Sequence, residues 1–180
     1  MTRSREGSVP GEPLHFHFAP INLGEHADLC VRFRLDSYVC SFGSSARFYA
    51  DNTSDQGYVD WLRKRMHELP GSCVHLWRGI EIIGQLEMGR SGENSQIGYV
   101  NLCYLVPDAR GSGASRQLDE YLCEFHATLG LERAHLNVSP SNDRAIRYYE
   151  KYLWKNRGDD PRHAELLLFE KTFEPAQRAR

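Results

Sequence analysis

The sequence predicts an α/β (α+β) fold: a single domain with a mixed central sheet of about six to seven strands and about four helices. The first half of the chain holds several extended stretches separated by polar turns, which predict an antiparallel meander. The second half runs strand, helix and strand, which predicts one β-α-β unit. A length of 180 residues with 41% hydrophobic composition is enough for one core and requires no second domain. We expect this domain to span residues 14–174, after a mobile tail of residues 1–13.

Before the meander, the pattern predicts one strand and two helices. Apolar and polar residues alternate from Leu14 to Ile21, as in a half-buried strand. Apolar residues at helical spacing then predict helices over Gly24–Phe42 and Tyr58–Leu69. The residues between them, Gly43–Gly57, are rich in Ser, Asn, Asp and Gly, and they predict a loop.

The predicted meander consists of the extended stretches Cys73–Trp77, Glu81–Met88 and Ile97–Val106. The third stretch is apolar nearly throughout, which is typical of a central strand covered on both faces. Pro107 ends it, because proline cannot donate a ladder hydrogen bond. The sheet should therefore continue on the far side of this third strand.

The remaining elements complete the β-α-β unit and close the sheet. Residues Ser112–Leu129 place a leucine-rich stripe on one helical face, and Gly130 supplies a stop. The alternation around Ala134–Val138 predicts a strand parallel to the one that ends at Val106, with the helix as crossover. A helix over Asn142–Leu153 and a largely apolar strand over Ala164–Phe173 follow.

Charge and cysteine content exclude several classes of protein. The formal net charge of −2 provides no overall basic field for nucleic acid or an anionic membrane, and no apolar run is long enough to cross a bilayer. The five cysteines form no C-x-x-C pair and no Cys/His cluster with metal-ligand spacing. We therefore expect no nucleic-acid partner, no membrane partner and no metal. Reduced, mostly buried thiols indicate a cytoplasmic protein.

A glycine turn lies between the third meander strand and the long helix. It comprises Arg110, Gly111, Ser112, Gly113, Ala114 and Ser115. The free N–H groups of a first helical turn bind anions, and glycines let the backbone approach a phosphate closely. Arg110 and Arg116 can add charge-assisted contacts. By itself this turn is a generic anion site, because many such turns only complete a helix N-terminus.

Two familiar phosphate motifs do not match this turn. A P-loop needs a lysine after its last glycine, where this chain has Ala114-Ser115-Arg116. A dinucleotide fingerprint needs a third glycine at the position of Arg116 and an acidic residue near Leu136 and Asn137. A nucleotide-binding domain of either kind is therefore disfavoured.

Two blocks of residues resemble the GNAT superfamily of N-acetyltransferases. The turn Arg110-Gly111-Ser112-Gly113-Ala114-Ser115 resembles its Q/R-x-x-G-x-G/A acetyl-CoA signature, with Ser115 in place of the last Gly or Ala. The segment Asn142 to Lys151 is similar to its N-x-x-A-I-x-x-Y-E-K helix. The blocks occur in the right order within residues 100–154, so together they are far more specific than either alone. The resemblance implies a single GNAT-like domain.

The resemblance also implies a reaction and assigns residues to it. A neutral amine attacks the thioester of acetyl-CoA directly, and CoA thiolate departs. Tyr149 matches the family's tyrosine, whose phenol protonates that thiolate. The main chain where the two parallel strands splay would bind the pantetheine arm and polarise the thioester carbonyl. The implied acetyl-CoA contacts are Cys103, Tyr104, Leu105, Arg110, Gly111, Ser112, Gly113, Ala114, Ser115, Arg116 and Asn142.

The general base is the open position in this assignment. One branch of the family has a glutamate where this chain has Asn137, and an asparagine cannot accept the proton. Glu87 is the leading substitute, directly or through a water, and Tyr99, Asn101 and His163 are weaker alternatives. Tyr149 could also be only a core aromatic, and Asn142 only a helix cap.

The acceptor is expected between the loop Ser41–Gly57 and the segment Asn156–His163, both mixed in charge. The primary function expected is acetyl-CoA-dependent N-acetylation of a primary amine on a small molecule or peptide. The alternative is a non-catalytic acyl-CoA-binding or sensing module of the same fold, because of Asn137. The strand Ala164–Phe173 offers a pairing edge, so a monomer and a homodimer both stay open.

Overall fold

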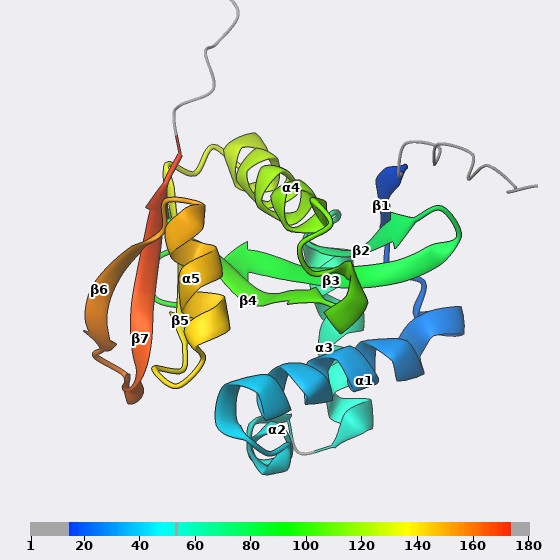
Figure 1. Ribbon diagram of the computed structural model, residues 1–180, viewed down its shortest axis with the longest axis horizontal. Helices are drawn as coiled ribbons and strands as arrows, with labels where there is room; N and C mark the ends of the chain where they lie inside the picture. The colour runs from blue at the N-terminus through cyan, green and yellow to red at the C-terminus, as the bar shows by residue number, and fades with distance from the viewer. Residues whose placement is uncertain (1–14, 53, 174–180) are drawn as a thin grey trace, which may run out of the picture.

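A computed structural model describes residues 15–52 and 54–173, and these form one mixed sheet in the order β1-β2-β3-β4-β5-β7-β6 (Figure 1). The predicted tail, residues 1–13, lies outside the described residues, as do both ends of the predicted domain. All pairs are antiparallel except β4 with β5. The strands are β1 (Phe16–Pro20), β2 (Cys73–Arg78), β3 (Glu81–Arg90), β4 (Gly98–Leu105), β5 (Arg133–Val138), β6 (Lys155–Asp160) and β7 (His163–Thr172).

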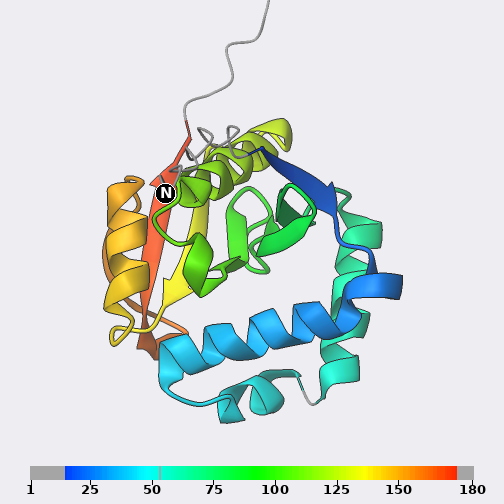
Figure 2. The ribbon, with the colours of Figure 1, turned by 45° about the vertical axis from the view of Figure 1, so that its right-hand side comes forward.

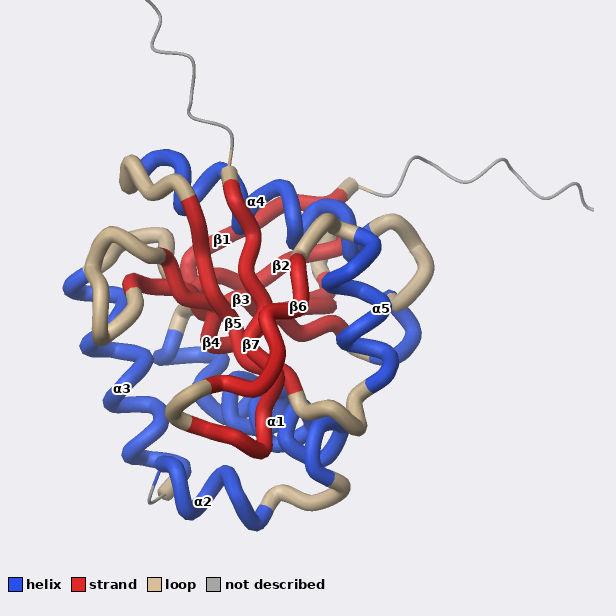
Figure 3. The backbone as a smooth tube through the Cα atoms, turned by 90° about the vertical axis from the view of Figure 1, so that its left-hand side faces the viewer, coloured by secondary structure: helices blue, strands red, loops and turns tan. Residues whose placement is uncertain are grey.

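Helices cover both faces of this sheet. Figure 2 shows α1 and α4 on opposite sides of the strands, and Figure 3 shows α2 and α3 on the side of α1. The helices are α1 (Leu23–Phe42), α2 (Ala46–Asn52), α3 (Asp55–Glu68), α4 (Ala114–Thr128) and α5 (Asp143–Lys151), with a short 3₁₀ turn over Pro107–Ala109. The single mixed sheet with helices on both faces confirms the predicted fold class.

The core is divided by the sheet into two main apolar clusters. Leu118 and Leu122 of α4 and Tyr149 of α5 pack against one face, together with Leu86 and Leu136 from the strands. The other face packs against α1, α2 and α3 through a cluster of buried residues: Cys30, Val31, Tyr38, Phe48, Tyr58, Val59 and Leu62. The apolar stripes predicted for the long helices therefore face the sheet on both sides.

Two segments differ from the sequence prediction. The predicted loop Gly43–Gly57 contains α2, whose one fully buried residue, Phe48, packs against Tyr38 and Tyr58. The segment predicted as a loop around residues 156–163 contains β6, an edge strand that is exposed except at Asp160. The helix α2 was missed because it is short and buries only Phe48, and β6 was missed because an exposed edge strand of polar residues carries no apolar alternation.

The parallel strands β4 and β5 pair only at their beginning, and this positions the site. Their register covers Gly98 with Ala134 and Tyr99 with His135, after which β4 continues to Leu105 without β5 (Figure 1). The first residues after the pairing, Val100 and Asn101, already border the gap that forms between the two strands. The main-chain groups of β4 on this side are therefore left for other partners.

Candidate active site

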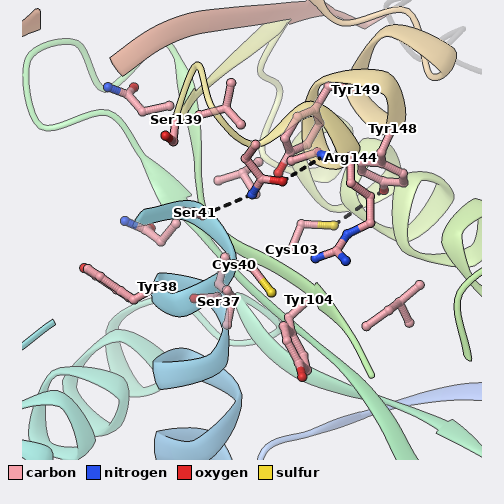
Figure 4. Close-up of a pocket in the computed structure, with 18 of the residues that line it drawn as sticks. Ser37, Tyr38, Cys40, Ser41, Cys103, Tyr104, Ser139, Arg144, Tyr148 and Tyr149 are labelled. Carbon is pink, nitrogen blue, oxygen red and sulfur yellow. Dashed lines mark hydrogen bonds between the residues drawn. The ribbon is translucent and has the colours of Figure 1, made fainter. Parts of the chain in front are cut away.

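A cleft of about 480 Å³ opens where β4 and β5 separate (Figure 4). Its walls come from β4, the end of β5, the last turns of α1, α2 and one face of α5 along its whole length. Two hydrogen bonds tie α1 to α5 across it: Asn142 Nδ2 donates to Ser41 Oγ at 3.2 Å, and Ser141 Oγ donates to the Ser41 carbonyl at 3.3 Å. The cleft is thus bounded by elements that the fold holds in fixed positions.

The glycine turn forms one end of the cleft. Gly111 and Gly113 adopt φ of 84° and 91°, in the left-handed region that favours glycine. Gly113 caps α4 without a side-chain hydrogen bond. The N–H groups of Gly111, Gly113, Ala114 and Ser115 donate no hydrogen bond to any described residue. Unpaired N–H groups at the start of a fifteen-residue helix form an anion site.

The basic side chains near the turn are not all placed as expected. Arg110 lines the cleft, but its Nε donates to the Leu105 carbonyl at 3.1 Å and its Nη2 lies 4.0 Å from Asp36. Arg116 does not line the cleft, because its Nε pairs with Glu120 at 2.7 Å on the exposed face of α4. Arg110 therefore links the end of β4 to α1, and Arg116 lies on the surface of α4.

Two basic residues of α5 line the cleft and were not identified from the sequence. Arg144 and Lys151 both border it, and Figure 4 shows the Arg144 side chain extending into it. They are seven positions apart with Tyr148 between them, so the three share one helical face. This helical spacing relative to Tyr148 could have identified both residues from the sequence. These cations can complement the negative charge of a donor bound at the turn.

The wall of the cleft over β4 offers main-chain groups and one inert thiol. The Asn101 and Leu105 carbonyls are held by Arg34 and Arg110, while Cys103, Tyr104 and Leu105 line the cleft between them. Burial raises the pKa of the Cys103 thiol to about 12. A thiol of that pKa is protonated at neutral pH and a poor nucleophile. An acyl-cysteine intermediate on Cys103 is therefore disfavoured.

Tyr148 and Tyr149 both border the cleft from α5 (Figure 4). The Tyr148 hydroxyl donates to the Ser115 carbonyl at 3.4 Å and lies 3.5 Å from Cys103 Sγ. The Tyr149 ring packs against Trp154 and Phe169, with centroids 5.8 and 6.0 Å away. Burial, reinforced by Cys103, holds the pKa of Tyr149 well above 10, so the phenol keeps its proton until a strong base is near.

Asn142 fulfils the capping role that the sequence left open. Its Oδ1 accepts the Ala145 N–H at 3.1 Å, and its amide nitrogen donates to Ser41. Asn142 also lines the cleft. The side chain is therefore fully engaged in starting α5 and in binding α1 to it.

Glu87 lies beneath the cleft and does not line it. Its carboxylate is fully buried, with Arg34 Nη1 at 3.3 Å and Gln85 Nε2 at 2.8 Å, and it accepts a hydrogen bond from Tyr58. Arg34, 15% exposed, lies at the cleft wall and also donates to the Asn101 carbonyl at 2.6 Å. The structure thus does not bring Glu87 together with Tyr149. It makes Glu87 the counter-ion of Arg34.

The residue in the glutamate position, Asn137, lies in a chain of three hydrogen-bonded side chains. Tyr99 donates its hydroxyl proton to Asn137 Oδ1 at 3.1 Å, and Asn137 Nδ2 donates to Asp160 Oδ2 at 2.5 Å. Tyr99 and Asn137 line the cleft, while Asp160 is only 1% exposed behind them. From the sequence, Asp160 is only one of the mixed charges of Asn156–His163, because its partners come together only through the sheet.

The part of the cleft in which the acceptor is expected is lined from α1, α2 and β7. Phe42, Arg47 and Asp51 border it, which agrees with the expected contribution of Ser41–Gly57. The expected contribution of Asn156–His163 is wrong, because β6 lies on the outer side of β7 and none of its residues line the cleft. Among the described residues that line the cleft, Asp51 is the one carboxylate, and it accepts the Tyr38 hydroxyl proton at 2.7 Å.

Over residues 15–52 and 54–173, no three His, Cys, Asp or Glu side chains are grouped so that they could hold a metal ion. No helix in the same part of the chain combines the length and the apolar composition needed to span a bilayer.

A helix start with unpaired N–H groups that opens onto separated parallel strands is an arrangement that can accept a phosphate group. The profile of the acetyltransferase (GNAT) family matches residues 36–153, and the chain belongs to that family. No curated protein sequence matches the chain.

Solved acetyltransferase structures share the fold at low sequence identity. The PaiA N-acetyltransferase of Thermoplasma acidophilum, in complex with coenzyme A, has 13% identity and a TM-score of 0.72 over 89% of this chain and all of its own. An acetyltransferase of Thermus thermophilus has 21% identity and a TM-score of 0.66 over 89% and 98%. Spermidine N-acetyltransferase of Vibrio cholerae, in complex with CoA and spermine, has 14% identity and a TM-score of 0.67 over 89% and 96%.

Proposed function

We propose that this protein is an acetyl-CoA-dependent N-acetyltransferase that acts on a primary amine of a small molecule or peptide. The observation that carries the proposal is the run of unpaired N–H groups at Gly111, Gly113, Ala114 and Ser115, at one end of a cleft that Tyr149 also lines. An anion site and a buried phenol in one cleft are what a CoA thioester and its leaving thiolate require. Family membership and the CoA complexes of two structural neighbours support this donor.

Acetyl-CoA would lie along the gap between β4 and β5. Its pyrophosphate would accept hydrogen bonds from the glycine turn, with Arg144 and Lys151 adding positive charge. Its pantetheine arm would follow Cys103, Tyr104 and Leu105, where β4 has left β5. This placement brings the thioester toward Tyr149, which borders the same cleft.

The chemistry is direct transfer. The lone pair of the neutral amine attacks the thioester carbonyl carbon and gives a tetrahedral intermediate. Its collapse breaks the C–S bond, and the departing thiolate takes the proton of the Tyr149 phenol. The nitrogen loses its extra proton to solvent, and the Tyr149 phenolate regains a proton from solvent before the next turnover. The high pKa of the Cys103 thiol disfavours the competing route through an acyl-enzyme.

The charge at the acceptor end favours a cationic substrate. Arg47 is paired there with Glu165 at 2.7 Å and lies 3.8 Å from Asp51, while Arg34 is neutralised by Glu87. These five charges leave the acceptor end with a net charge of −1, which attracts the ammonium form in which an amine arrives. The structural neighbour bound to spermine supports a polyamine as one acceptor to test.

The test is turnover of acetyl-CoA with spermidine, phenethylamine and a hexapeptide with a free N-terminus. We expect CoA thiol release that depends on at least one amine, together with a product that carries one acetyl group by mass spectrometry. The control is the same mixture with each amine already N-acetylated. Thermal stabilisation by CoA without turnover of any amine would contradict the enzyme and favour the acyl-CoA-binding module.

A further inference from the structure

The hydrogen-bonded chain Tyr99–Asn137–Asp160 runs across the sheet from the cleft to a buried carboxylate. Tyr99 comes from β4, Asn137 from β5 and Asp160 from the end of β6, so three separate strands build it. Only Tyr99 and Asn137 reach the cleft wall. These hydrogen bonds therefore connect the cleft wall, which an acceptor would contact, to the buried Asp160 carboxylate, which it would not contact.

Asp160 fixes the direction of every hydrogen bond in this chain. Burial opposes its ionised form, but donors from the Arg162 N–H, the Asn137 amide and the Arg162 guanidinium outweigh burial and lower the pKa of Asp160 to about 2. An ionised carboxylate only accepts hydrogen bonds. The Asn137 amide must therefore present its NH₂ to Asp160, as the structure shows.

The same constraint passes on to Tyr99. With its NH₂ on Asp160, Asn137 presents its oxygen to Tyr99, and the Tyr99 hydroxyl has to donate. Burial raises the pKa of Tyr99 above 10, so the phenol is neutral at physiological pH. Its single proton is therefore committed to Asn137, and its oxygen lone pairs are what it can offer to a molecule in the cleft.

We propose that Tyr99 is the hydrogen-bond acceptor that binds an N–H of the acceptor amine, with Asn137 and Asp160 turning its own proton away from the cleft. This inference rests on the proposed function, which supplies the amine. A hydroxyl that only accepts is complementary to an amine or ammonium and unfavourable for a carboxylate or ester oxygen. One held N–H also limits the directions in which the nitrogen lone pair can point.

This role differs from that of a general base. A neutral phenol whose proton is already donated does not remove a proton from the substrate, so Tyr99 binds and orients. Asn137 and Asp160 act through it and are positioning residues. One branch of the family has a glutamate at the position of Asn137. Here an amide stands there, which donates to the buried Asp160 carboxylate and therefore accepts the Tyr99 proton.

The first experiment is Tyr99→Phe, which removes the acceptor oxygen and keeps the ring. With the best amine among spermidine, phenethylamine and the hexapeptide, kcat/KM for the amine should fall about tenfold or more, since the attacking nitrogen gains positive charge and its N–H becomes a charged donor in the transition state. The thermal shift produced by CoA should stay at the wild-type value. Wild-type kcat/KM for the amine in this variant would overturn the inference and leave the proposed function intact.

The second experiment uses Asp160→Asn to reverse the direction of the hydrogen bonds between residues 160, 137 and 99. The new amide can donate to Asn137, whose amide then turns and directs its NH₂ to Tyr99, so that the Tyr99 proton points into the cleft. We expect a loss of kcat/KM similar to that of Tyr99→Phe, and no further loss in the double variant. Asp159→Asn, at the exposed neighbouring position, is the matched control and should behave as wild type.

The outcomes of the second experiment separate this role from a structural one. If Asp160→Asn lowers activity equally in the wild-type and Tyr99→Phe backgrounds, the effects are additive and the proposed coupling is wrong. If Asp160→Asn does not fold, Tyr99→Phe alone decides. Failure of all three amines with wild-type protein would overturn the proposed function and this inference together.

Discussion

At the scale of single residues, activity and stability depend on the environment of a few phenols, carboxylates and imidazoles. Tyr148 and Tyr149 are neighbours in sequence and both border the cleft, yet their surroundings differ. Tyr148 is engaged with the Ser115 carbonyl and the Cys103 thiol, while Tyr149 is placed by Trp154 and Phe169. A proton donor needs a hydroxyl that is free to turn to the thiolate, and this favours Tyr149.

Replacing the Tyr149 hydroxyl should slow the chemical step. In Tyr149→Phe we expect kcat to fall about 100-fold, because the thiolate then leaves without a proton donor. The KM for acetyl-CoA should change little, and steady-state kinetics measure both. Tyr148→Phe is the matched control, expected to retain most of its kcat. An equal loss in the two variants, or a larger one in Tyr148→Phe, would contradict the assignment.

His75 should make the protein sensitive to acid. Its ring is buried beside Cys30 and Gln85, and burial lowers its pKa from 6.5 to about 4. Between these values the unfolded chain binds a proton that the folded protein does not. The stability that neutral His75 preserves is therefore complete above pH 6.5 and is lost as pH falls toward about 4.

Urea unfolding at pH steps from 7 down to 4 measures this linkage. Wild-type protein should lose stability across the window, and His75→Gln should lose on the order of 3 kcal/mol less, the amount that a shift of this size corresponds to. The free energy of unfolding of the variant should still fall somewhat with decreasing pH, because burial also lowers the pKa of His126. If the free energy of unfolding falls equally with pH in both proteins, His75 does not cause the acid sensitivity.

At the scale of elements, the end of α5 carries local strain. Leu153 has φ of 65°, the left-handed conformation in which glycine is usual after a helix, and its side chain is 77% exposed. Leu153→Gly should relieve about 1 kcal/mol of strain while losing little packing. Differential scanning calorimetry should then show a melting temperature about 2–4 °C higher.

The matched control is Leu153→Ala, which removes the exposed side chain and keeps the strained backbone. It should melt close to wild type. A glycine variant that is no more stable than the alanine variant would show that the left-handed conformation costs nothing here.

The pair Arg34–Glu87 fastens α1 to the sheet. Because Glu87 is fully buried and Arg34 is 15% exposed, Glu87→Gln leaves a guanidinium without its counter-ion. We expect a loss of about 3–5 kcal/mol in urea unfolding. Glu165→Gln breaks the more exposed pair with Arg47 and should cost less than about 1 kcal/mol. Near-normal stability of Glu87→Gln with loss of the acidic limb of the pH–rate profile would instead make Glu87 the general base.

The sequence predicts the elements that carry apolar periodicity and misses those that do not. The leucine stripe of α4 and the alternation in β5 are properties of their own residues. Phe48 is the one fully buried residue of α2, and β6 contains no apolar residue, so neither element has a local signal. The glycine turn could be found because its function requires glycines at fixed spacing.

The candidate site likewise contains residues that could be predicted from the sequence and residues that could not. Tyr149 and the turn occur in motifs, so they could be named from the sequence. Asp160 and Arg34 depend on pairings between residues 23 and 53 positions apart, which only the folded sheet brings together. Glu87 was the leading candidate base because the burial of a single polar residue on a strand cannot be predicted from the sequence.

At the scale of the whole molecule, the separation of β4 from β5 organises the site. It opens the cleft in the middle of the sheet and places the start of α4 at one end, with its unpaired N–H groups. The hydrogen bonds between Ser41 and the start of α5 hold the two helices on either side of it. Donor and acceptor would therefore enter from different ends and meet beside Tyr149.

The most direct test of this arrangement is a crystal structure with CoA. We expect pyrophosphate oxygens within hydrogen-bond distance of the N–H groups of Gly111, Gly113 and Ala114, and the CoA sulfur beside the Tyr149 hydroxyl. A pyrophosphate bound away from this turn, or a sulfur on the side of β4 that faces β3, would contradict it.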